Sequence, residues 1–187
     1  KSINQIKHKS IKAVLKNFDK RKKSLELIHS ADLPALSGLG SSSAFTASLI
    51  NLIYSNNNEQ ISKRELANKS VYIEKKVLKE SVGYQDQFAS SFGGFNIINF
   101  SKNKISVNSI NIPENKIKNL LDNMVLYFTG LQRHAQVIEK NKIENLDKNE
   151  DFLKKIYSNA IEAKNILYSK KKSFLPELGG LLHKSWE

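Results

Sequence analysis

Apolar residues recur at helical spacing in some segments and at strand spacing in others, which predicts a mixed α/β protein. The spacing predicts a helix over residues 6–18 with one apolar face. Residues 44–54 predict a second helix that is apolar over most of its surface, and such a helix is usually buried. Apolar runs at 95–100 and 105–110, joined by a polar turn, predict two paired strands.

The remaining pattern alternates helices with short extended segments. Partial period-2 alternation predicts a strand over Ser24–Ser30. Ser62 and Glu65 have the spacing of a capping box, which predicts the start of a long helix. A short helix is expected to end at the glycines after residue 92, and a strand at 124–129 is expected to open a second region.

A glycine- and serine-rich segment, Asp32–Ala44, joins the first predicted strand to the apolar helix. Glycine lets the backbone approach a ligand closely, and the free N–H groups at a helix start attract an anion. Serine hydroxyls can cap the helix, bind phosphate oxygens or hold a metal. No Gly-Lys-Ser/Thr follows, and the third glycine of the dinucleotide fingerprint is missing. The segment therefore indicates a phosphate site of another kind, the alternative being a turn that only caps the helix.

Three segments resemble the GHMP kinases, the family named for galactokinase, homoserine kinase, mevalonate kinase and phosphomevalonate kinase. Pro-Ala-Leu-Ser-Gly-Leu-Gly-Ser-Ser-Ser-Ala at 34–44 resembles the family's nucleotide-phosphate loop. Residues 81–96, which contain Gly-Tyr-Gln-Asp-Gln, resemble the segment with the catalytic aspartate. They are closest to the sugar 1-kinase branch that includes D-glycero-D-manno-heptose 7-phosphate kinase. Residues 127–135 are similar to the Tyr-Thr-Gly-x-x-Arg-x-Ala stretch of that branch.

The resemblance implies ATP and Mg²⁺ as cofactors and a role for each matching residue. The implied contacts to ATP come from Pro34, Ser37, Gly38, Leu39, Gly40, Ser41, Ser42 and Ser43. The implied metal ligands are Ser42 and Glu74, and the implied catalytic residue is Asp86, which accepts or orients the proton of a sugar hydroxyl. The implied substrate contacts are Gly83, Gln85, Thr129 and Arg133.

Each of these roles has a plainer alternative. Glu74 lies among lysines, as a solvated glutamate on a charged helix face would. Asp86 could have no role other than a favourable interaction of its carboxylate with the positive end of a helix dipole. Arg133 could pair with a carboxylate on a neighbouring helix instead of gripping a sugar phosphate. Gln85 and Gln87 could contact substrate or face solvent.

The fold implied by the resemblance is α+β, the two-domain GHMP kinase architecture. Residues 1–113 match the N-terminal domain, which resembles the second domain of a ribosomal small-subunit protein. Residues 120–187 match a truncated, ferredoxin-like C-terminal domain, in whose core Trp186 is expected to pack. The family's N-terminal Arg/Gly/Ser strand motif and its Gly-rich C-terminal motif are missing, so we expect an internal fragment.

Composition excludes several classes of site and partner. The chain of 187 residues has no cysteine, so it has neither a disulfide framework nor a cysteine-based metal site. No apolar run reaches membrane-spanning length, and we expect no membrane partner and a cytoplasmic location. The net charge of +12 invites a nucleic-acid partner. Lysines are spread throughout the chain and no nucleic-acid-binding module accompanies them, so we expect none.

The sequence therefore predicts an ATP-dependent kinase that transfers the γ-phosphate to a hydroxyl of a sugar or sugar phosphate. The acceptor favoured by the resemblance is the anomeric hydroxyl of D-glycero-D-manno-heptose 7-phosphate. Another sugar 1-kinase, of the galactose or fucose type, and a catalytically inactive nucleotide-binding fragment remain as alternatives. The sequence does not predict the oligomeric state.

Overall fold

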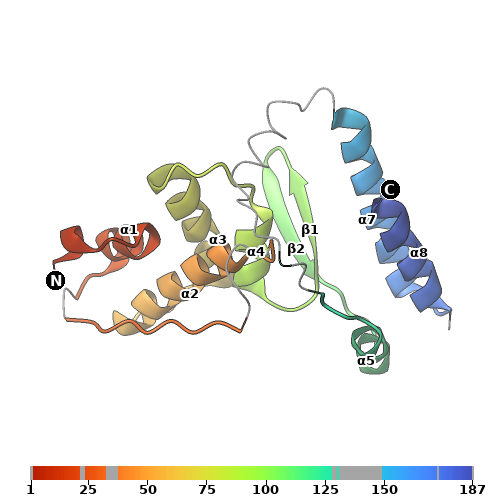
Figure 1. The fold of residues 1–187 in the computed structure, drawn as a ribbon, viewed down its shortest axis with the longest axis horizontal. Coiled ribbons are helices and arrows are strands. Elements are labelled where there is room, and N and C mark those ends of the chain that lie inside the picture. The colour runs from red at the N-terminus through yellow and green to blue at the C-terminus, as the bar shows by residue number, and fades with distance from the viewer. Residues whose placement is uncertain are drawn as a thin grey trace. The chain divides into compact units, whose positions relative to one another are not determined.

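The computed structural model describes residues 2–21, 24–32, 38–127, 130, 149–171 and 173–186 (Figure 1). The chain divides into two compact units. The first comprises Lys1–Ile110 with Phe128–Lys140, and the second comprises Asn111–Tyr127 with Asn141–Glu187. The predicted domain boundaries at 113 and 120 stay a prediction.

Helices make up most of the first unit. A short 3₁₀ turn, η1 (Ile3–Gln5), precedes the first helix. The longer helical elements are α1 (Lys9–Phe18), α2 (Ser41–Asn56), α3 (Lys63–Val71), the π-helical turn η2 (Tyr72–Val77) and α4 (Gln85–Phe92). Helix α1 begins three residues later than predicted, because the ring of His8 caps it by accepting a hydrogen bond from the backbone N–H of Ile11. The Ser62 hydroxyl caps α3 by accepting from the N–H of Glu65, as the capping-box spacing predicts.

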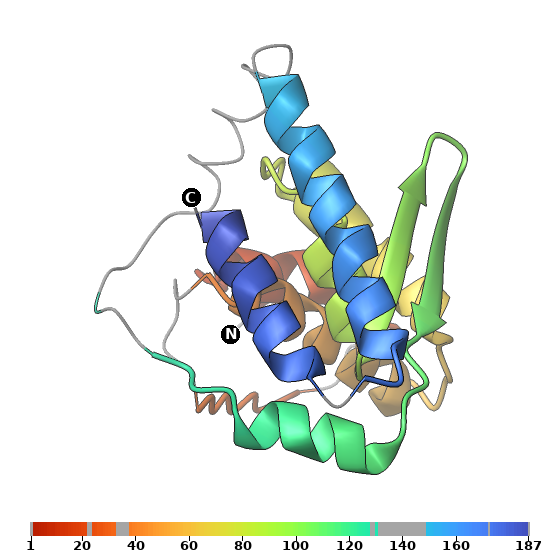
Figure 2. The same cartoon turned by 90° about the vertical axis from the view of Figure 1, so that its right-hand side faces the viewer.

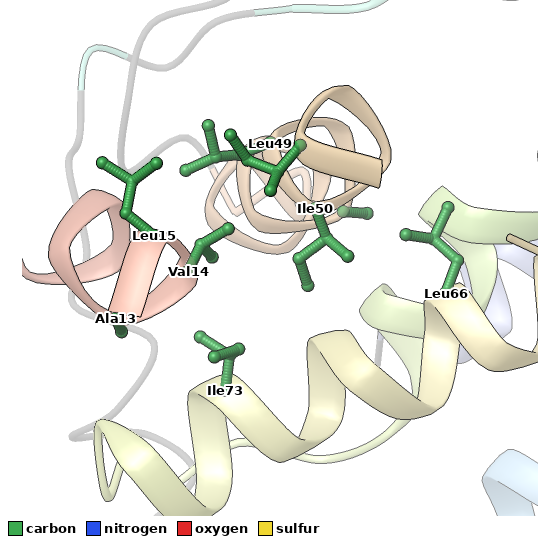
Figure 3. Close-up of a cluster of buried hydrophobic side chains, with 9 residues drawn as sticks. Ala13, Val14, Leu15, Leu49, Ile50, Leu66 and Ile73 are labelled. Atoms are coloured by element: carbon green, nitrogen blue, oxygen red, sulfur yellow. The ribbon is translucent and has the colours of Figure 1, made fainter. Parts of the chain in front are cut away.

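The core of this unit lies where α1, α2 and α3 with its extension η2 meet. Val14, Ile50, Ile53 and Ile73 have no exposed surface. Figure 3 shows side chains from all three helices pointing into the space between them. The apolar helix predicted at 44–54 is therefore largely buried, although Leu52 on its outer face is half exposed.

The two strands of the first unit form the predicted hairpin. Strand β1 (Asn96–Ser101) pairs antiparallel with β2 (Lys104–Ser109), and Phe100 faces Ile105 in the register. Gly93 and Gly94 both have positive φ and end α4 just before β1, as predicted. Arg64 of α3 donates to the carbonyl oxygen of Ile105, which ties the hairpin to the helices.

Two other predicted strands are wrong. Ser24–Ser30 has no strand hydrogen bonds, and neither do residues 124–127 of the segment predicted at 124–129, whose last two residues lie outside the described ranges. A strand exists only where a neighbouring strand completes its ladder, and among the described residues β1 and β2 pair only with each other. Ser24–Ser30 instead packs beside the core helices, with the ring of His29 edge-on to Phe45.

The second unit is helical in its described part. It contains α5 (Glu114–Asp122), α7 (Glu150–Tyr168) and α8 (Phe174–Trp186), and Figure 2 shows α7 and α8 side by side with α5 near one end of the pair. The Lys116 ammonium of α5 donates to the carbonyl oxygens of Leu167 (2.6 Å) and Ser169 (2.7 Å) at the end of α7. The expected ferredoxin-like character of this part stays a prediction.

Trp186 does not pack in a core, contrary to expectation. It is 90% exposed, because it is the last residue of α8 and the helix presents it outward. None of the described helices combines the length and the apolar character needed to cross a membrane.

Candidate functional site

The glycine-rich segment ends at the start of α2 in a conformation suited to holding an anion. Gly38 and Gly40 have φ of 78° and 70°, the left-handed region that glycine adopts without steric cost. The first hydrogen bond of the helix runs from the N–H of Ala44 to the carbonyl oxygen of Gly40. The backbone N–H groups of the three serines before Ala44 therefore have no acceptor inside the helix, and they lie at the positive end of its dipole.

Asp86 lies directly against this helix start. It is an exposed residue in the first turn of α4. A Cβ atom placed on Gly40 would be 3.3 Å from Cγ and 3.4 Å from Oδ2 of Asp86. The fold thus places the predicted catalytic carboxylate beside the predicted phosphate loop. The first-turn position also agrees with the helix-dipole alternative. The position of Asp86 is therefore compatible with both a catalytic role and a role in stabilising the helix.

Glu74 is buried rather than solvated, so the alternative of a glutamate on a charged surface is wrong. It is 1% exposed. Its Oε2 atom accepts hydrogen bonds from the Ser43 hydroxyl (2.9 Å) and from the Gln87 side-chain amide (2.5 Å). Its Oε1 atom is closed to solvent and has no hydrogen-bond partner. Such an orphaned carboxylate oxygen is costly unless something binds it.

Glu74 owes this place to the π-helical turn η2 that continues α3. In this turn the N–H of Leu78 bonds to the carbonyl oxygen of Ile73, a five-residue step, and the N–H of Glu80 closes the turn on the carbonyl oxygen of Glu74. Ile73 and Glu74, consecutive in sequence, are both buried. Short π-helical turns are frequent at functional sites, because they re-aim side chains within an otherwise regular helix.

The residues around Glu74 fit a magnesium ion shared with a nucleotide. Mg²⁺ binds hard oxygen ligands, usually one or two carboxylates together with phosphate oxygens and water. Glu74 offers a free carboxylate oxygen close to the serines that begin α2. Within the described ranges no group of three or more His, Asp or Glu side chains could hold a metal by itself. A cation at Glu74 would therefore take its other ligands from a bound phosphate, a serine hydroxyl or water.

The structure distinguishes between the serines of this segment. Ser43, and not its neighbour, is the serine whose hydroxyl contacts Glu74. Ser42 is exposed, and its carbonyl oxygen accepts a hydrogen bond from the Thr46 hydroxyl. The implied role of Ser42 as a metal ligand stays a prediction.

The structure describes some of the other predicted site residues and not the rest. Gly83 and Gln85 are exposed in the segment that leads to Asp86, and Leu39 is half exposed beside Gly40. Their roles stay predictions. Four predicted site residues lie outside the described ranges, namely Pro34, Ser37, Thr129 and Arg133.

Gln87 is a buried member of the candidate site that the sequence analysis did not predict. It neither faces solvent nor sits at an exposed surface, since it is 1% exposed and donates to Glu74. One signal could have revealed this: Gln87 is four residues before Ser91 and adjoins Phe88, and these three side chains form the buried face of α4.

Part of the chain matches a known protein family. Residues 6–94 match the family model described as GHMP kinases N terminal domain. The chain is 34% identical over 176 residues to a D-glycero-alpha-D-manno-heptose 7-phosphate kinase of Campylobacter jejuni. The aligned region covers 92% of this chain and 51% of the relative.

Two solved structures are similar to this chain. One is a D-glycero-D-manno-heptose 1-phosphate kinase from Bacteriodes thetaiotaomicron, with a TM-score of 0.74, 29% identity, and coverage of 95% of this chain and 53% of that one. The other is assigned as a sugar kinase from Campylobacter jejuni, with a TM-score of 0.69, 31% identity, and coverage of 95% and 50%. The chain thus spans about half the length of these relatives. The start of α2, Glu74 and Asp86 all lie within residues 6–94, the part of the chain that is similar to a GHMP kinase N-terminal domain.

Proposed function

We propose that this chain is the nucleotide-binding part of an ATP-dependent sugar kinase. In this function the γ-phosphate of ATP passes to a hydroxyl group of a sugar or sugar phosphate. The observation that carries the proposal is the contact between Asp86 and Gly40. It places a carboxylate beside a helix start whose free N–H groups suit a phosphate.

Phosphoryl transfer asks a protein mainly for alignment, charge neutralisation and a group that handles the proton of the attacking hydroxyl. The N–H groups at the start of α2 supply alignment and part of the neutralisation. Asp86 is exposed, so a sugar hydroxyl can come within hydrogen-bond reach of its carboxylate. The carboxylate then accepts or orients the hydroxyl proton while the oxygen attacks the γ-phosphorus, the bond from the γ-phosphorus to the β–γ bridging oxygen breaks, and ADP leaves.

The proposal includes Mg²⁺ as a cofactor. Glu74, with the implied ligand Ser42, would hold the ion, and a bound Mg²⁺ would neutralise negative charge on the phosphates of ATP. The chain's own contribution is the fixed carboxylate of Glu74, since its Oε2 atom is held from two sides and its Oε1 atom remains free of protein partners.

The acceptor we propose is the anomeric hydroxyl of D-glycero-D-manno-heptose 7-phosphate. The names of two relatives support a heptose phosphate, although one names the 7-phosphate and the other the 1-phosphate. Substrate choice separates these readings: phosphorylation of a heptose 7-phosphate at the anomeric position and of a heptose 1-phosphate at O7 would both yield a 1,7-bisphosphate, so each monophosphate is offered separately. A cytoplasmic location, where ATP is available, goes with this proposal.

The test is ATP consumption by the complete protein against a panel of sugars and sugar phosphates. We expect selective turnover of heptose 7-phosphate and its loss in Asp86→Asn. Asp151→Asn is the matched control, because the Asp151 side chain is 92% exposed on α7, in the second unit. Turnover of galactose or fucose would reassign the acceptor. Nucleotide binding without turnover of any sugar would contradict the kinase assignment and support the inactive nucleotide-binding alternative.

A further inference from the structure

Three buried polar side chains from three separate elements meet inside the first unit. Ser43 comes from the first turn of α2, Glu74 from the π-helical turn η2 and Gln87 from α4. They are 4%, 1% and 1% exposed, respectively. Burying an ionisable side chain is costly unless its polar atoms are bonded, so each contact in this group has an energetic consequence.

The hydrogen bonds are distributed unevenly over the Glu74 carboxylate. Both donors, the Ser43 hydroxyl and the Gln87 amide, bond to the same oxygen, Oε2. The other oxygen, Oε1, has no partner. If the cluster served only to satisfy a buried glutamate, spreading the donors over both oxygens would stabilise it better. The observed pattern holds one oxygen and leaves the other without a hydrogen-bond partner.

We propose that Gln87 is a positioning residue which, with Ser43, fixes the Glu74 carboxylate so that Oε1 binds the divalent cation of a bound nucleotide. This inference rests on the proposed function. A cation suits Oε1 because it supplies the positive charge that the buried carboxylate lacks, whereas the hydrogen bonds to Oε2 fix the plane of the group. Residues that orient a metal ligand in this way typically change metal affinity about 10–100-fold when they are replaced.

Gln87 also links this carboxylate to the proposed catalytic residue. It directly follows Asp86 on α4, so its amide ties the helix that carries Asp86 to the turn that carries Glu74. Because Oε1 is closed to solvent, side chains that cover Glu74 must shift when the cation binds. If Gln87 orients Glu74, then replacing Gln87 should weaken the part of nucleotide binding that depends on the cation and should leave metal-free nucleotide binding largely unchanged.

The experiment measures ADP binding by calorimetry in the full chain, once with Mg²⁺ and once with EDTA. In the unaltered protein we expect Mg²⁺ to strengthen ADP binding. Gln87→Met keeps the approximate side-chain volume and removes the donor. We expect it to weaken Mg-ADP binding about 10–100-fold and to leave metal-free ADP binding within about twofold. Ser91→Ala is the control, because Ser91 is buried on the same face of α4 and its hydroxyl has no hydrogen-bond partner.

The outcomes separate the inference from the function on which it rests. Equal losses with and without Mg²⁺, or an effect confined to thermal stability, would show that Gln87 is merely structural. An unaltered protein that binds ADP without any response to Mg²⁺ would overturn the cation role of Glu74. Failure of the unaltered protein to bind nucleotide under either condition would instead overturn the proposed function. If Gln87→Met does not fold, Ser43→Ala takes its place, because it removes the other donor to Oε2 and keeps the backbone N–H.

Discussion

Replacing Gly40 by alanine tests the contact on which the proposed function rests. The backbone of Gly40 is left-handed, and its added Cβ would meet Asp86 Cγ at 3.3 Å, tighter than ordinary van der Waals contact. The left-handed region costs a residue with a Cβ atom about 1–2 kcal/mol. Relieving the contact by moving the exposed Asp86 side chain off its rotamer adds about 0.5–1.5 kcal/mol.

Gly38→Ala is the matched control within the same segment. Gly38 has a φ of 78°, close to the 70° of Gly40, but a Cβ on it would meet no atom within 4 Å. Both variants therefore carry the same conformational cost, and only Gly40→Ala carries the cost of displacing Asp86. We expect the free energy of unfolding to fall by about 1 kcal/mol more in Gly40→Ala than in Gly38→Ala.

Urea denaturation at 25 °C, without nucleotide, measures this difference. Making both glycine substitutions again in a protein that carries Asp86→Ala completes a double-mutant cycle. Asp86→Ala removes the two nearest atoms, Cγ and Oδ2, and leaves Cβ at 3.5 Å, an ordinary contact distance. The difference between the two glycine variants should then shrink to within about 0.5 kcal/mol. Equal destabilisation by the two alanines in the original background would refute the Gly40–Asp86 contact.

Three further substitutions test the framework around the site. Lys79→Gly should raise the free energy of unfolding by about 1 kcal/mol, because Lys79 follows η2 with a φ of 57° that glycine adopts without strain; no gain in urea denaturation would contradict this. Ser62→Ala should lower it by about 1 kcal/mol, since the hydroxyl caps α3, and an unchanged transition midpoint would show that the cap contributes nothing. Lys116→Met should destabilise the second unit by about 2 kcal/mol, because a charged donor to the end of α7 is lost; hydrogen exchange in the last turn of α7 should speed up, and unchanged protection there would argue against it.

Elements whose signals are local in sequence were predicted well. The hairpin β1–β2 carries its own partner and its own turn, and the cap of α3 needs only Ser62 and the N–H three residues later. The strand expected at Ser24–Ser30 failed for the opposite reason. Alternation makes a segment suitable for a sheet, but the ladder needs a neighbouring strand that the local pattern does not reveal.

The features of the candidate site also differ in whether a local sequence signal predicts them. That the glycine- and serine-rich segment leads into a buried helix could be predicted, because glycine and serine at a helix start have local physical consequences. The burial of Glu74 could not, because Lys75 and Lys76 beside it suggest an exposed face. Only the hydrogen bonds that Glu74 accepts from Ser43 of α2 and Gln87 of α4 show which side of the helix is covered. Spacing alone also gives no reason for Gly40 and Asp86 to meet across 46 residues; the family resemblance implied a role in ATP binding for the first and in catalysis for the second.

Helix α2 explains why these distant residues converge. Its first turn contacts Glu74 through Ser43 and adjoins Asp86 at Gly40, whereas its middle provides Leu49 and Ile50 to the core. A helix moves as a nearly rigid rod, so the packing of its middle against α1 and α3 sets the position of its first turn. The two carboxylates reach that turn from different elements, and Gln87 joins those elements by one hydrogen bond. The geometry proposed for phosphoryl transfer is therefore fixed by the core rather than by the loop, which explains how a glycine-rich segment can serve as a precise binding site.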